Sequence, residues 1–85
     1  MNNKILKEKD FFKTSDLSLA VSLSLFCPLE AIDKPPNSNR GFFMFKISEQ
    51  LDVLIGQYHK GELRIEPLSY FNQLRHIKTR LYNSE

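Results

Sequence analysis

Residues 40–61, RGFFMFKISEQLDVLIGQYHKG, decide the fold of this chain. Aromatic side chains recur in the first part of this stretch with the density typical of a strand, which we expect to span residues 41–47. Ser48 then offers the side-chain oxygen of a helix N-cap, and apolar residues follow at helical spacing. Gly61 suits the left-handed residue that ends such a helix. A strand that leads into a capped amphipathic helix indicates a domain of mixed α and β structure.

The predicted strand at residues 41–47 is apolar on both faces. Phe43 and Phe45 point to one side, and Phe42 and Met44 point to the other. A central strand covered on both sides explains this pattern, and so does an exposed contact surface made of Phe42 and Met44. The sequence alone leaves both alternatives open.

The chain before this stretch predicts a strand followed by a helix. We expect a short strand at residues 11–14, and Asp16 has the side chain of a helix cap. Residues 17–25 combine helical spacing with a strand-like alternation of leucine and serine; the cap, Ala20 and the stop at Pro28 favour the helix. Because its apolar residues occupy two faces, this helix is either deeply buried or part of an oligomer contact.

A hairpin and a closing helix complete the predicted elements. Residues 29–34 form a strand candidate that pairs with residues 41–47 across a proline- and asparagine-rich loop at residues 35–39. Residues 63–65 are a further short strand candidate, and Pro67 begins the last helix. The predicted order is β-α-β-β-α-β-α, an α+β fold in which three helices pack with a small antiparallel sheet.

The composition fits one small soluble domain. The chain has 85 residues, of which 41% are hydrophobic and 26% charged, with a net charge of +2. We expect a flexible arm at residues 1–10 and a single domain at residues 11–85. The first residues lack the apolar core of a signal peptide, no run is long enough to span a bilayer, and Cys27 has no disulfide partner. These features predict a cytoplasmic protein without membrane contact.

Four segments together resemble a family of short prokaryotic and phage domains that is catalogued only as a domain of unknown function. They are FKTSDLSLA at residues 12–20, PLEAI at 28–32, FMFKISEQLDVLIGQYHKGELRIEP at 43–67 and FNQLRHIKTRLY at 71–82. The resemblance covers nearly everything after residue 11. It implies the domain limits and a mobile-element or phage setting, and it brings no activity, ligand or catalytic residue.

The start of the central stretch is similar to the signature of RNA-recognition domains, in which a basic residue and a glycine precede aromatic residues that stack bases on a sheet face. The predicted strand–helix–hairpin–helix–strand order suits that fold. However, Phe43 occupies the position of a small residue, and Met44 lies where a second stacking aromatic is expected. A buried hydrophobic strand is therefore the favoured interpretation.

The basic closing helix gives a less specific indication of nucleic-acid binding. The candidate residues are Arg75, Lys78 and Arg80 on that helix, Lys4, Lys7 and Lys9 on the arm, and Arg40 and Phe42 as outer candidates. Contacts of this kind to phosphates are salt-sensitive and weakly sequence-selective. The alternative explanation of these charges is an ordinary solvated surface.

A second hypothesis is a protein-interaction domain or a homodimer. Its contact residues would be Leu19, Leu23 and Phe26 of the first helix, or Phe42 and Met44 of the strand. The test that separates the two hypotheses is whether the basic residues share one face or an exposed apolar patch dominates.

No pattern of residues predicts an enzyme. His59 and His76 lack the spacing of a metal site, and Cys27 is expected to be a small buried hydrophobic residue. Asp16 is better explained as a helix cap than as a general base. We therefore expect a non-catalytic module with no cofactor, no metal and no small-molecule substrate.

Overall fold

The computed structural model describes residues 10–38 and 40–83. The elements are β1 (Phe11–Thr14), α1 (Leu17–Ser24), β2 (Ala31–Asp33), β3 (Phe42–Lys46), α2 (Glu49–Lys60) and α3 (Pro67–Asn83). Three helices and a three-stranded antiparallel sheet confirm the predicted α+β class. The expected flexible arm at residues 1–10 lies outside the described residues, except for its last residue.

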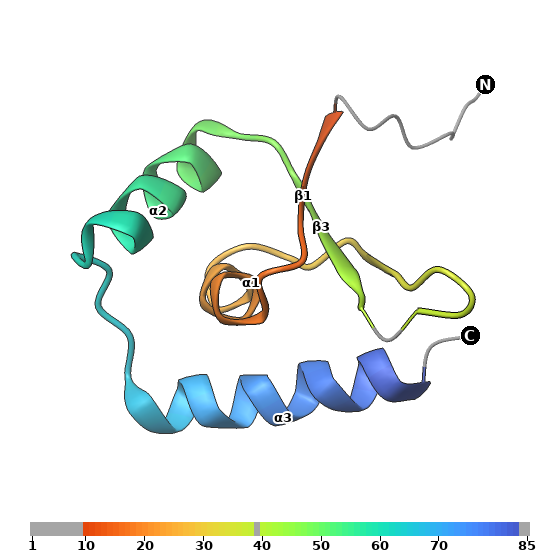
Figure 1. Ribbon diagram of the computed structural model, residues 1–85. Coiled ribbons are helices and arrows are strands. Elements are labelled where there is room, and N and C mark those ends of the chain that lie inside the picture. The colour runs from red at the N-terminus through yellow and green to blue at the C-terminus, as the bar shows by residue number, and fades with distance from the viewer. Residues whose placement is uncertain (1–9, 39, 84–85) are drawn as a thin grey trace.

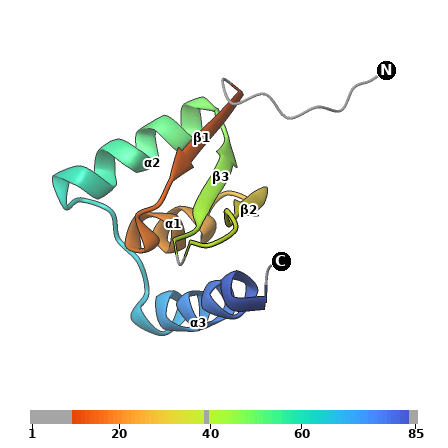
Figure 2. The same cartoon turned by 45° about the vertical axis from the view of Figure 1, so that its right-hand side comes forward.

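The sheet has the strand order β1-β3-β2, and both outer strands are antiparallel to β3. The predicted hairpin is therefore confirmed, with Ile32 opposite Phe43. On the other side of β3, Phe12 pairs with Phe45. Figure 1 views the sheet nearly along its edge, with α1 and α2 to one side of it, and Figure 2 shows the three strands more openly.

The hydrophobic core lies between the inner face of β3 and the three helices. Its buried members are Phe43 and Phe45 of β3, Leu19, Ala20, Val21 and Leu23 of α1, Leu51 and Leu54 of α2, and Ile77 and Leu81 of α3. Because α1 touches both other helices and the sheet, both of its apolar faces are covered. Deep burial, and not an oligomer contact, explains the pattern of this helix.

This burial corrects part of the second functional hypothesis. Leu19 and Leu23 are 3% and 0% exposed, so they belong to the core and offer no surface to a partner. Only Phe26, which follows the end of α1, is exposed. An interface built on these three residues is therefore wrong.

Capping residues fix where the first two helices begin and where α2 ends. Asp16 accepts a hydrogen bond from the backbone N–H of Leu19 at 3.2 Å, and Ser48 accepts one from the N–H of Leu51 at 3.0 Å. Gly61 ends α2 with a positive φ of 73°, a conformation that favours glycine. All three predicted caps are confirmed.

The strand predicted at residues 63–65 does not form, so the observed order is β1-α1-β2-β3-α2-α3. Leu63 packs against the hydrophobic core, while Arg64 is exposed. The alternation of apolar and polar residues comes from packing against helices, because the segment passes on the side of α1 away from β3 (Figure 1). Residues 63–65 therefore do not pair with a strand of the sheet.

Candidate nucleic-acid interface

Helix α3 is held at its start by a side chain that the sequence motifs did not indicate. The Glu66 carboxylate accepts hydrogen bonds from the backbone N–H of Leu68 at 3.0 Å and of Ser69 at 2.7 Å, and from the Ser69 hydroxyl at 2.9 Å. These hydrogen bonds, that of the Ser69 N–H above all, lower the pKa of Glu66. Glutamate is not among the preferred N-cap residues, which is why this cap was missed.

Two parallel rows of side chains run along α3. The inner row consists of Tyr70, Leu74, Ile77 and Leu81, all packed in or against the core. The outer stripe, as we call the second row, consists of Phe71, Arg75, Lys78 and Tyr82, all exposed. Both rows have successive spacings of four, three and four residues, which places each on one face of the helix. The amphipathic helix therefore presents to solvent two adjacent cationic side chains with an aromatic side chain at either end.

The outer stripe combines two aromatic rings with two positive charges. Phe71 is 52% exposed and Tyr82 is 66% exposed, high values for such large apolar side chains. The Arg75 guanidinium lies over the Phe71 ring, 5.7 Å from its centroid, as in a cation–π contact. Within residues 10–38 and 40–83, neither Arg75 nor Lys78 forms a salt bridge. Their charges are therefore available to an anionic ligand.

The predicted basic residues do not all share this face. Arg75 and Lys78 are three residues apart and are neighbours on the helix surface. Arg80 comes two residues after Lys78, and a helix turns by about 100° per residue, so Arg80 points to the opposite flank. Lys4, Lys7 and Lys9 lie outside the residues that the structure describes.

Arg40 lies beside the C-terminal part of α3. It lines a shallow hollow together with Gly41 and Leu81. A β carbon on Gly41 would overlap with a terminal methyl group of Leu81, so a larger residue at this point would require the Leu81 side chain to move. Close packing against α3 thus explains this glycine without any reference to the RNA-recognition signature.

Phe42 occupies the sheet face that points away from Phe43 and the core. Its ring is partly exposed, and the Lys13 ammonium lies 5.2 Å from the ring centroid. On the same face Lys13 also pairs with Asp33 at 3.4 Å, and Met44 is only 9% exposed. The apolar surface offered here is therefore small, and Phe42 stands apart from the outer stripe.

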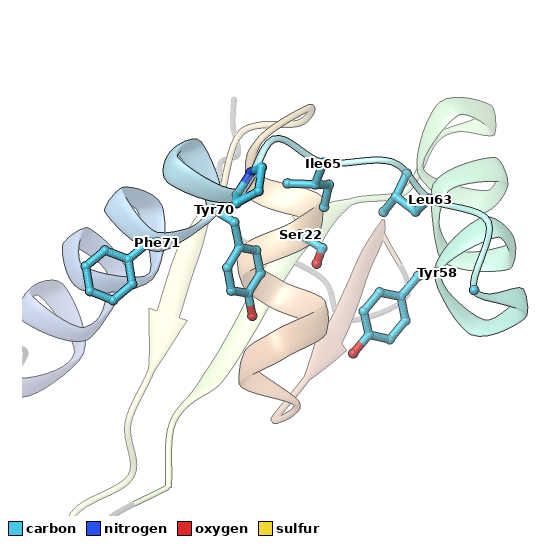
Figure 3. A pocket seen from close by; sticks show the side chains of 8 residues that line it. Ser22, Tyr58, Leu63, Ile65, Tyr70 and Phe71 are labelled. Atoms are coloured by element: carbon cyan, nitrogen blue, oxygen red, sulfur yellow. The ribbon is translucent and has the colours of Figure 1, made fainter.

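A groove open to solvent lies between α1, α2, the connector and α3, with a volume of about 560 Å³. Its lining residues are Ser22, Tyr58, Gly61, Leu63, Ile65, Pro67, Tyr70 and Phe71. The hydroxyl groups of Tyr58 and Tyr70 both approach the Ser18 hydroxyl oxygen, at 2.9 and 3.4 Å. In Figure 3, Ser22 lies between these two tyrosines, and Phe71 lies beyond Tyr70 along α3.

The other reactive side chains have structural roles. Cys27 is partly buried against the core, and burial raises the pKa of its thiol, which disfavours the nucleophilic thiolate. His59 lies in the last turn of α2, and His76 is exposed on α3. No group of three metal-ligating side chains occurs among the described residues.

No helix in the described part of the chain has both the length and the apolar character needed to cross a bilayer.

The fold and the exposed stripe define a small α+β domain with a sheet covered by helices on one face and with a long, partly aromatic C-terminal helix. The chain belongs to the family described as Domain of unknown function (DUF5659), whose model matches residues 9–83. This match confirms the family resemblance inferred from the sequence. Comparison with curated proteins and with solved structures finds no significant match.

Proposed function

We propose that this domain is a non-catalytic module that binds nucleic acid through the outer stripe of α3. The supporting observation is that two exposed aromatic rings, Phe71 and Tyr82, flank two cations on one helix face, and neither cation forms a salt bridge within the described part of the chain. Lysine and arginine side chains neutralise backbone phosphates, and exposed aromatic rings stack on bases. Buried apolar contacts on the inner row hold the helix in place while the outer stripe stays free for the ligand.

Arg40 shares a hollow with Leu81 of the inner row and stays a predicted phosphate contact outside the outer stripe. Arg80, on the opposite flank, is not part of it. The proposal keeps the cytoplasmic, mobile-element or phage setting that the sequence predicts. Lys4, Lys7 and Lys9 remain predicted phosphate contacts.

The test is a fluorescence-anisotropy titration with short single-stranded and double-stranded DNA and RNA at low salt. Replacing Arg75 with glutamine (Arg75→Gln) should weaken binding, because one phosphate contact is lost. Arg80→Gln is the matched control: it removes the same charge from the same helix, away from the outer stripe. Equal effects of the two substitutions would contradict the outer stripe as the contact surface.

A second candidate function is self-association through α3. Three of its exposed side chains, Leu68, Phe71 and Tyr82, are large and apolar, which is typical of an interaction surface. Sedimentation equilibrium of the wild-type protein and of a Phe71→Ser variant tests this function. A dimer that dissociates on this substitution would support self-association, and a monomer at all concentrations would exclude it.

A further inference from the structure

The groove and the outer stripe form one continuous surface, because Phe71 belongs to both. Its ring lines the groove, and the Arg75 guanidinium lies over that ring. A ligand that reaches from the groove along α3 therefore meets positive charge immediately beside an apolar hollow. Glu66, just before α3, accepts three hydrogen bonds from the first turn of that helix.

Aromatic side chains from two helices line the groove. Tyr58 comes from α2 and Tyr70 from α3, and their hydroxyl groups converge on one oxygen of Ser18. Figure 3 shows Ser22 between the two tyrosines, with Leu63 and Ile65 along the connector. The lining is therefore mainly aromatic and aliphatic and is open to solvent.

We propose that this groove takes one unpaired base of a single-stranded nucleic acid, whose adjacent phosphates contact Arg75 and Lys78. This inference rests on the proposed function. It adds that the ligand is a single-stranded nucleic acid and not a duplex. A planar base can stack on the aromatic side chains that line the groove, and such stacking tolerates every base. In a duplex the bases are paired and stacked on one another, so none is free to enter.

The first experiment compares three ligands of equal length on the wild-type protein: a single-stranded oligonucleotide, the same strand with abasic sites throughout, and a duplex. All three carry phosphates, and only the first offers unpaired bases. Base stacking predicts an affinity for the intact single strand that is about fivefold to a hundredfold higher than for the abasic strand. The duplex should bind no more tightly than the abasic strand.

The possible results distinguish base insertion into the groove from the more general proposal that the outer stripe binds phosphates. Equal affinity for the intact and abasic strands would overturn base insertion and leave the phosphate-binding function standing. Binding to none of the three ligands would overturn both. Stronger binding of the duplex than of the single strand would also overturn base insertion.

A groove-filling substitution provides the second test. Ile65 lines the groove without belonging to the hydrophobic core, so Ile65→Phe should narrow the groove and preserve the fold. Val53→Phe on the exposed side of α2 is the control for added apolar bulk, since Val53 is 58% exposed and lies outside the groove. We expect Ile65→Phe to lower single-strand affinity to the abasic level and Val53→Phe to leave it unchanged. Unaltered binding in a folded Ile65→Phe variant would overturn the inference.

Tyrosine fluorescence gives a readout that does not depend on this substitution. The chain has three tyrosines and no tryptophan, and two of the tyrosines line the groove. In a Tyr82→Phe background, which keeps an aromatic ring on the outer stripe, the remaining tyrosine emission comes from Tyr58 and Tyr70 alone. Quenching by the intact strand, and not by the abasic strand, is the expected result. Absence of quenching at saturating single strand would overturn base insertion.

Discussion

The hydroxyl of Tyr58 on α2 donates a hydrogen bond to the hydroxyl oxygen of Ser18 on α1, at 2.9 Å. The residues are far apart in the sequence, and Tyr70 of α3 approaches the same oxygen at 3.4 Å. One serine therefore joins all three helices. Because Tyr58 and Tyr70 also line the groove, these contacts connect the packing of the helices with the proposed binding surface.

Tyr58→Phe removes one of these hydrogen bonds and keeps the ring. We expect the free energy of unfolding to fall by about 0.5–1.5 kcal/mol, toward the low end because the contact is exposed to solvent. Urea denaturation measures this change. Tyr82→Phe serves as the control, since Tyr82 is 66% exposed on the outer stripe. Equal destabilisation by both substitutions would contradict a role for the Ser18 contact.

Two glycines should respond in opposite directions to alanine. Gly41→Ala places a methyl group against Leu81 and should destabilise the fold by about 1–3 kcal/mol, the usual cost of overpacking. Gly56 lies inside α2 with open space around its α carbon, so Gly56→Ala should stabilise the protein by about 0.4–1 kcal/mol. Thermal melting of both variants measures the two effects. A melting temperature that rises for Gly41→Ala would refute the close packing of α3 on β3.

Phe45 should be indispensable for folding. Its side chain is 0% exposed at the centre of the sheet, and Phe45→Ala should cost about 3–5 kcal/mol, much of the stability of so small a domain. Ile47, just after β3, is 47% exposed, and Ile47→Ala should have a minor effect. Circular dichroism during urea denaturation measures both. Near-wild-type stability of Phe45→Ala would show that the core is placed incorrectly.

The Glu66 cap should make stability depend on pH. Because the pKa of Glu66 in the folded protein is below its ordinary value of 4.5, its contribution is present above pH 4.5 and is lost as the pH falls through the folded-state pKa. Glu66→Gln should therefore lower the melting temperature at neutral pH, and the difference from wild type should close in acid. Glu62→Gln, which changes an exposed glutamate of the same connector, is the control. A constant difference at every pH would contradict the proposed cap.

Local signals made most of the fold predictable. Asp16, Ser48 and Gly61 mark the helix boundaries through contacts with residues close in sequence, so their roles follow from the local pattern. The order β1-β3-β2 did not follow, because strand neighbours are set by contacts distant in sequence. Residues 63–65 were predicted to form a strand because apolar and polar residues alternate there. Packing of a connector against helices produces the same alternation.

The candidate site was only partly visible in the sequence. Arg75, Lys78 and Arg80 were grouped by charge, although the helical rotation places Arg80 on the other side of the inner row from Arg75 and Lys78. The same rotation applied to Phe71 and Tyr82 places both aromatics with the two cations, a signal that was present in the sequence. The groove was not predictable, because Tyr58, Tyr70 and Ser22 come together only through the packing of three helices.

The salt dependence of binding tests the central claim most directly. For wild-type protein and a short single-stranded oligonucleotide, the logarithm of the affinity should fall linearly with the logarithm of the salt concentration. The slope should shrink by about 0.7 for each phosphate contact removed, hence in Arg75→Gln and in Lys78→Gln but not in Arg80→Gln. No saturable binding at low salt, or the same slope in all four proteins, would contradict nucleic-acid binding through the outer stripe of α3.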